Sequence, residues 1–128
     1  PMLSSLDERF ADAPSLLRMA KAYNDDLRLC HRLDKETSGC LILAKDDETY
    51  RFVSMEFEHR RVLKKYHAIV EGIHQLEMEE VDLPIGTGRN GLMRVDFGSG
   101  KEALTYFNSV QYFRHYTLVE CTPITGRT

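Results

Sequence analysis

Two strand-like segments near the end of the sequence constrain the fold most strongly. Residues 103–112 and 116–122 are rich in β-branched and aromatic side chains, and only Phe113, Arg114 and His115 separate them. A connection this short favours pairing of the two segments as an antiparallel hairpin. We therefore expect an antiparallel sheet in this part of the chain.

The earlier part of the sequence contains two predicted helices. Residues 15–23 have apolar side chains spaced for one face, which predicts a short helix. Residues 47–60 place Tyr50, Val53 and Phe57 on one stripe, which predicts a second helix. Acidic residues begin this second segment and basic residues end it, in agreement with the helix macrodipole.

Two further strands are predicted between and after these helices. Residues 39–44 form a continuous apolar run of strand length, which predicts a strand buried on both faces. Residues 63–70 are richer in β-branched and aromatic residues and are followed by Gly72, which predicts a strand that carries Tyr66. No repeat or linker interrupts the sequence. The pattern as a whole predicts one α+β domain over residues 1–128.

The composition excludes several classes of protein. With 42% hydrophobic and 29% charged residues among 128, the sequence is typical of a globular domain with one core. Its longest uncharged stretch, residues 103–113, is far shorter than the ~20 apolar residues of a membrane-spanning helix. Cys30, Cys40 and Cys121 are odd in number and form no C-x-x-C pair. The cysteines therefore predict neither a disulfide framework nor a zinc ribbon, and a reducing cytoplasm is expected.

The charges are segregated along the chain. A net charge of −3 and a pI near 6.0 argue mildly against nucleic-acid binding, because phosphate contacts come from Lys and Arg. Arg60, Arg61, Lys64 and Lys65 nevertheless lie within six residues of one another. We call these four residues the basic cluster and expect a local positive patch from them.

Three glycines match the spacing of a dinucleotide-binding loop. Gly86, Gly88 and Gly91 form G-x-G-x-x-G, but that motif needs a helix directly after the glycines. Residues 92–100 have no helical periodicity, so we interpret the glycines as a hairpin loop. The five histidines likewise lack metal-ligand spacing, and no metal site is predicted.

Polar residues crowd directly before the predicted strand at residues 39–44. Loops at the ends of rigid strands often carry catalytic groups. Side chains such as Asp34, Thr37 and Ser38 equally make local turn hydrogen bonds in an exposed loop. Composition and spacing leave both interpretations open for residues 31–41.

A family resemblance favours the catalytic interpretation. His31-Arg32-Leu33-Asp34, followed by Thr37-Ser38-Gly39, resembles the H-R-L-D-x-x-T-S-G signature of the RluA family of pseudouridine synthases. Three further segments resemble motifs of that family in the same order: residues 64–72 its K-x-Y segment ending in Gly, residues 100–105 its G-K-x-A-x-T pattern, and residues 123–128 the start of its T-G-R-T-H-Q-I-R motif. The matches together extend over residues 30–128.

The resemblance implies a role for each matching residue. Asp34 would be the catalytic carboxylate, Arg127 the cation that keeps it ionised, and Tyr66 the aromatic residue against the target uracil. Arg32 would fill the gap left by the flipped nucleotide. The basic cluster would contact RNA phosphates. The expected partner is RNA, either rRNA or tRNA, and no cofactor, metal or membrane is implied.

The resemblance also implies a fold and an extent. The family fold is a mixed, largely antiparallel sheet with flanking helices. The family's Lys-Pro segment is not seen before Pro1, and H-Q-I-R does not follow Thr128. We therefore expect residues 1–128 to form a single catalytic domain without its N-terminal strand region and C-terminal part. A non-catalytic RNA-binding module, or an inactive remnant of the same fold, is the alternative.

Overall fold

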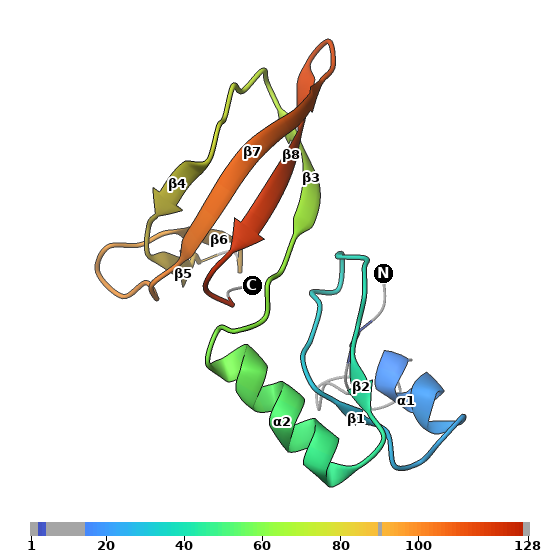
Figure 1. Ribbon diagram of the computed structural model, residues 1–128. Coiled ribbons are helices and arrows are strands. Elements are labelled where there is room, and N and C mark those ends of the chain that lie inside the picture. Colours follow the sequence, from blue (N-terminus) through green and yellow to red (C-terminus); the bar gives the residue numbers. More distant parts are fainter. Residues whose placement is uncertain (1–2, 5–14, 90, 127–128) are drawn as a thin grey trace. The chain divides into compact units, whose positions relative to one another are not determined.

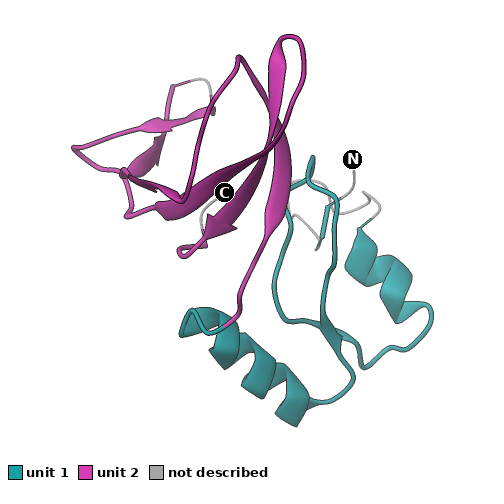
Figure 2. Ribbon diagram, turned by 45° about the horizontal axis from the view of Figure 1, so that its top comes forward, with its two compact units in different colours: residues 1–61 teal, residues 62–128 magenta. Residues whose placement is uncertain are grey.

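The helices and the large sheet belong to different parts of the chain. The computed structural model describes residues 3–4, 15–89 and 91–126, which fall into two compact units, residues 1–61 and residues 62–128 (Figure 2). Unit 1 contains α1 (Leu16–Lys21), β1 (Arg28–Leu29), β2 (Leu43–Ala44) and α2 (Asp47–Glu58). Unit 2 contains β3 (Tyr66–Glu71), β4 (Glu79–Asp82), β5 (Ile85–Thr87), β6 (Met93–Val95), β7 (Leu104–Tyr112) and β8 (Tyr116–Pro123). That residues 1–128 act as a single domain stays a prediction.

Helix α1 confirms the helix predicted over residues 15–23. Its N-cap is Ser15, whose hydroxyl accepts a hydrogen bond from the backbone N–H of Arg18 at 3.3 Å. Leu16 and Leu17 are half-buried, as the spacing predicts. The helix ends at Lys21, two residues before the predicted end.

The strand predicted over residues 39–44 is wrong in both length and burial. Only Leu43–Ala44 is a strand, paired antiparallel with Arg28–Leu29. Ala44 is buried, but Ile42 is 43% exposed. Burial of a strand on both faces requires layers on both sides and a partner of matching length. Within the described residues β2 has only the two residues of β1 to pair with.

Helix α2 confirms the second predicted helix. Asp46 is its N-cap and accepts hydrogen bonds from the N–H and the hydroxyl of Thr49, at 2.7 and 3.0 Å. The helix ends at Glu58, so the basic residues lie after its last turn rather than in it, which corrects the macrodipole argument. Arg60 follows in a left-handed conformation, φ 59°, and the N–H of Arg61 reaches back to the carbonyl of Glu56 at 2.9 Å. This is the Schellman pattern that ends many helices.

Unit 2 is built on a four-stranded antiparallel sheet in the order β3-β8-β7-β4 (Figure 1). The β7–β8 pair is the predicted hairpin, with a register shift between Ser109 and Gln111. The predicted strand at residues 63–70 is also confirmed, although it starts three residues later, at Tyr66. Since the ladders between named strands in the described residues are all antiparallel, the α+β, largely antiparallel fold class is confirmed.

The segment after β3 crosses one face of this sheet. Gly72 turns the chain with φ 89°, a conformation that glycine adopts without strain. The buried hydroxyl of Thr117 donates to the carbonyl of Gly72 at 2.8 Å and accepts from the N–H of His74 at 3.0 Å. The hydroxyl of Ser109 binds the same segment, at the carbonyl of His74 and the N–H of Leu76. Residues 72–76 therefore form a strap held by side chains of β7 and β8.

The glycine-rich segment is a hairpin loop, as interpreted from the sequence. Strands β5 and β6 pair antiparallel, and the N–H of Gly88 binds the carbonyl of Leu92 at 2.8 Å. Gly91 has φ 74° and donates to the carbonyl of Gly88 at 3.0 Å. A strand rather than a helix follows the glycines, so this segment lacks the helix N-terminus of a dinucleotide site. No helix within the described residues is long and apolar enough to span a membrane.

Candidate active site

The polar segment of residues 31–41 is a loop whose two ends are tied together. The β1–β2 ladder is continued by a hydrogen bond from the N–H of Cys30 to the carbonyl of Ile42 at 3.2 Å. The N–H of Ile42 then donates to Nε2 of His31 at 3.1 Å. Inside the loop, the N–H of Thr37 binds the carbonyl of Asp34 at 3.0 Å and closes a tight turn. The loop is therefore ordered by its own polar groups.

Asp34 is half-buried at the edge of a hollow of about 410 Å³. Just before it, the hydroxyl of Ser4 accepts from the N–H of Leu33 at 3.1 Å and donates to its carbonyl at 2.8 Å. The hollow is lined by residues of unit 1, namely Leu3, Ser4, Leu16, Leu33, Asp34, Lys35, Glu36, Thr37, Ser38, Gly39 and Leu41. The loop therefore places a carboxylate against a space large enough for a small ligand.

Arg32 and the T-S-G residues of the loop are exposed. Arg32 is exposed beside the half-buried Asp34, which leaves its guanidinium accessible to a ligand. Gly39 has φ 147°, a value that side chains rarely adopt. The backbone conformation therefore favours glycine at this position of the T-S-G motif, because any other residue there would strain the end of the loop.

Tyr66 lies at the start of β3 in unit 2. It is half-buried, and its direct cross-strand partner on β8 is Cys121. The two side chains lie on the same face of the sheet, as directly opposed residues of antiparallel strands do. Burial, as the larger cause, and the Glu120 carboxylate together raise the pKa of the Cys121 thiol.

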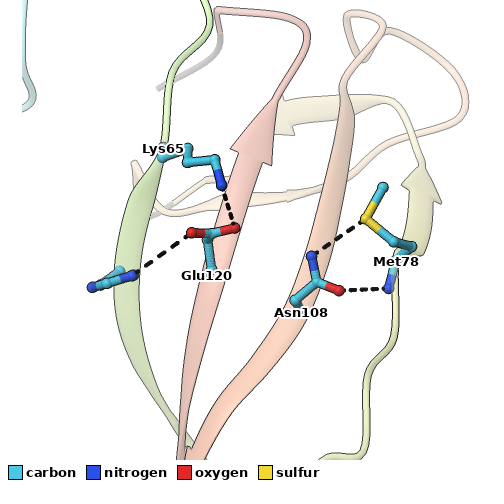
Figure 3. A network of polar contacts seen from close by, with 5 residues as sticks. Lys65, Met78, Asn108 and Glu120 are labelled. Atoms are coloured by element: carbon cyan, nitrogen blue, oxygen red, sulfur yellow. Dashed lines mark hydrogen bonds and ion pairs between the residues drawn. The ribbon is translucent and has the colours of Figure 1, made fainter.

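The boundary between the two units falls inside the basic cluster. In unit 1, Arg61 donates from Nε to Oε2 of Glu56 at 2.9 Å, and Arg60 is exposed two residues after the end of α2. That hydrogen bond lowers the pKa of the Glu56 carboxyl. In unit 2, Lys65 forms an ion pair with Glu120 across the β3–β8 ladder, at 2.9 Å (Figure 3). Arg61 and Lys65 thus have carboxylate partners, Glu56 and Glu120, that the sequence did not reveal.

Lys64 connects two motifs that are distant in the sequence. Its Nζ lies 3.5 Å from the carbonyl oxygen of Thr125, in the T-G-R-T segment. Thr125 is buried and accepts a hydrogen bond from the N–H of Leu104 at 3.1 Å through its hydroxyl. Within unit 2 the structure therefore brings together the K-x-Y segment and the start of the T-G-R-T segment. Arg127, the predicted partner of Asp34, lies outside the described residues.

The described residues contain no cluster of three or more His, Cys, Asp or Glu side chains arranged to hold a metal ion. The chemistry available in the two units consists of a loop carboxylate, a tyrosine and several cations. Asp34 and Arg32 belong to unit 1, and Tyr66, Lys64 and Lys65 to unit 2. A carboxylate and a tyrosine can each serve in acid–base or nucleophilic catalysis, and cationic side chains can bind phosphates.

Comparison with known proteins identifies the class. The chain belongs to the RNA pseudouridylate synthase family, whose model matches residues 2–128. This confirms the resemblance drawn from the four motifs.

Relatives and solved structures agree with this assignment. The chain is 35% identical over 116 residues to ribosomal large subunit pseudouridine synthase C of Buchnera aphidicola, which covers 88% of this chain and 36% of that protein. It is 34% identical to ribosomal large subunit pseudouridine synthase D of Zymomonas mobilis, covering 78% and 32%. Human RNA pseudouridylate synthase domain containing 4 superimposes with a TM-score of 0.66 at 33% identity, covering 88% of this chain and 49% of that one. The chain thus spans about a third of the length of these curated relatives.

Proposed function

We propose that this chain is the catalytic part of an RNA pseudouridine synthase, an isomerase that converts specific uridines in RNA to pseudouridine. The observation that carries the proposal is the H-R-L-D-x-x-T-S-G loop, which holds Asp34 half-buried beside a hollow of about 410 Å³ in a chain of this family. The reaction breaks the N1–C1′ bond of uridine, turns the base and joins C5 to C1′. The proton on C5 is lost and N1 gains one, so atoms balance without a cofactor.

Asp34 acts as the catalytic carboxylate in this proposal. It attacks carbon or removes a proton, and either role requires the ionised form. A cation within about 4–6 Å favours that form. Arg127 is the residue we assign to this task, on the strength of the T-G-R-T motif alone.

Tyr66 provides the aromatic face against the target base. Its half-buried position at the start of β3, opposite Cys121, supports this assignment, because stacking and water exclusion both favour a flipped-out uracil. Its hydroxyl is available for proton transfer. Arg32, exposed beside Asp34, stacks in the gap left by the nucleotide.

The basic cluster contacts RNA phosphates in this proposal. The ion pairs of Arg61 and Lys65 do not prevent this, because exposed ion pairs are weak in water and exchange with other anions. The ion pair of Lys65 with Glu120 does predict opposite effects on RNA binding when each partner is replaced. Replacing Glu120 by Gln should free Lys65 and strengthen RNA binding at low salt, whereas Lys65→Ala should weaken it.

The substrate class in this proposal is ribosomal RNA. Relatives of this chain are named ribosomal large subunit pseudouridine synthases, which supports rRNA over tRNA. Such a substrate, together with three free cysteines, supports a location in the cytoplasm. Cofactors and metals have no role in the proposed reaction.

The test is Asp34→Asn in the full-length protein, with Asp25→Asn as the matched control. Asp25 is an exposed aspartate between α1 and β1, outside the loop. Because C5 loses its hydrogen, RNA carrying tritium at uridine C5 releases it into water as the reaction proceeds. We expect large-subunit rRNA transcripts to be modified by the wild type and the control, and Asp34→Asn to retain less than a tenth of the rate while binding RNA normally. A variant that keeps more than a tenth of the rate contradicts the catalytic role of Asp34, whereas a wild type that releases no tritium contradicts the enzyme assignment and leaves an RNA-binding module.

Tyr66→Phe tests the role of the tyrosine separately. The substitution keeps the stacking face and removes the hydroxyl. A large loss of rate with retained binding supports proton transfer by Tyr66, whereas near-normal turnover confines it to packing against the base.

A further inference from the structure

We infer that His31 and Ser4 are positioning residues that hold the Asp34 loop at two points, an inference that rests on the proposed function. Both side chains bind backbone groups close to Asp34 in the chain, and neither needs to touch the substrate. The first point is the neck of the loop, where Cys30 and His31 bind Ile42. The second is the backbone of Leu33, the residue immediately before Asp34.

At the neck, the His31 side chain replaces a backbone hydrogen bond that would otherwise continue the β1–β2 ladder. The ladder pairs Leu29 with Leu43, and the N–H of Cys30 then donates to the carbonyl of Ile42 at 3.2 Å. Beyond this point, the N–H of Ile42 finds its acceptor in the ring of His31, at 3.1 Å from Nε2. The side chain thus extends the pairing by one bond and defines where the loop opens.

The orientation of the His31 ring is itself fixed. The ring stacks on Phe57 of α2, with centroids 4.4 Å apart and an interplanar angle of 21°. Phe57 lies on the half-buried stripe of a capped twelve-residue helix. Helix α2 therefore fixes the direction of the acceptor atom Nε2 through the stack on Phe57. Only an unprotonated Nε2 can accept the hydrogen bond.

The second point lies on the other side of Arg32. The Ser4 hydroxyl makes two hydrogen bonds to Leu33, accepting from its N–H at 3.1 Å and donating to its carbonyl at 2.8 Å. The carbonyl of Ser4 accepts from the N–H of Leu17 at 3.1 Å, at the start of α1. Leu33 is therefore tied to a helix through one serine.

The two points together restrict Asp34 on the scale that catalysis requires. A catalytic group must be held to within about 0.5 Å, and a displacement of about 1 Å can cost a hundredfold in rate. The remainder of the loop contains exposed residues with one internal turn bond. Loss of either anchor should therefore lower the chemical rate and leave RNA affinity unchanged.

The test compares variants of the full-length protein with tritium-labelled large-subunit rRNA transcripts as the probe. His31→Phe keeps the stack on Phe57 and removes the acceptor, whereas His31→Gln places an amide oxygen near the position of Nε2. We expect His31→Phe to lower kcat about tenfold or more with KM within about twofold, and His31→Gln to recover much of the loss. Ser4→Ala and Ser4→Thr form the corresponding loss and rescue pair.

The control is His74→Phe, which removes a histidine hydrogen bond in unit 2, from Nε2 to the carbonyl of Glu71 at 2.8 Å. It should keep the wild-type kcat. If His31→Phe does not fold, the Ser4 pair decides the question. Folded variants of both residues with wild-type kcat overturn the inference, as does a loss of rate that the rescue substitutions do not reverse.

A readout without substrate separates this inference from the proposed function. Hydrogen exchange of the Ile42 amide should be faster in His31→Phe than in the wild type, and unchanged in His74→Phe. A wild type that makes no pseudouridine overturns the proposed function and any catalytic role of the anchors. Unchanged Ile42 exchange in an active protein overturns the His31 anchor alone.

Discussion

Thr117→Val should destabilise unit 2 measurably although it removes hardly any volume. The Thr117 side chain is fully buried, and its hydroxyl binds two backbone groups of the strap, the carbonyl of Gly72 and the N–H of His74. Valine has nearly the same shape, so it fills the space and leaves no cavity. The substitution therefore removes two hydrogen bonds and little else.

The magnitude follows from those two bonds. A typical internal hydrogen bond contributes about 1 kcal/mol net, and a donor or acceptor left buried without a partner costs about 1–3 kcal/mol. Gly72 is half-buried and His74 exposed, so water reaches the strap and the lower values apply. We expect Thr117→Val to reduce the free energy of unfolding by about 2 kcal/mol.

The assay is urea unfolding of the wild type and the variant, followed by far-ultraviolet circular dichroism. Thr122→Val is the matched control on the same strand, because no hydrogen bond of the Thr122 hydroxyl occurs among the residues described. The control should change stability little. A loss below about 0.5 kcal/mol for Thr117→Val, or an equal loss for both variants, would show that the strap is not held by this hydroxyl.

Three further outcomes follow from local geometry. Hydrogen bonds from Thr49 lower the pKa of the Asp46 carboxyl from 3.8, so its stabilisation is present above that pH and is lost as the pH falls through the lowered value. The difference in free energy of unfolding between wild type and Asp46→Ala should therefore shrink in acid, as parallel urea titrations would show. Arg60→Gly should raise the melting temperature, because it relieves a left-handed strain of about 1 kcal/mol, partly offset by the flexibility of glycine when unfolded. Gly100→Ala should prevent folding of the β6–β7 connection, because a Cβ there would collide with the carbonyl oxygen of Asp96, and soluble wild-type-like protein would contradict this.

The helices and strands that were predicted correctly depend on residues that are close together in the sequence. Tyr50, Val53 and Phe57 repeat at helical spacing within a few residues of one another, which is enough to predict α2. The three-residue connection before β8 likewise determines its pairing with β7. The length of the strand at residues 39–44 depends instead on what lies beside it. An apolar run of six residues looks the same whether its partner has six residues or two.

The candidate site likewise divides into residues that local sequence identifies and contacts that depend on distant residues. The motif residues could be named from the sequence because the spacing of the motifs is itself sequence information. Their partners could not, because Ser4 is 29 positions from Leu33, and Glu120 is 55 from Lys65. Such contacts depend on the strand register and on the packing of α1, neither of which spacing within a motif can reveal.

The antiparallel register of β3 and β8 explains why two motifs so far apart in the sequence meet in unit 2. Tyr66, the first residue of β3, lies opposite Cys121, near the end of β8. Whatever precedes β3 must then lie beside whatever follows β8, which places Lys64 at the carbonyl of Thr125. A shift of this ladder by one residue would turn Tyr66 to the opposite face, since side chains alternate along a strand. It would also separate Lys64 from its acceptor. The K-x-Y segment and Thr125 therefore lie together in unit 2 because a single ladder sets the positions of both.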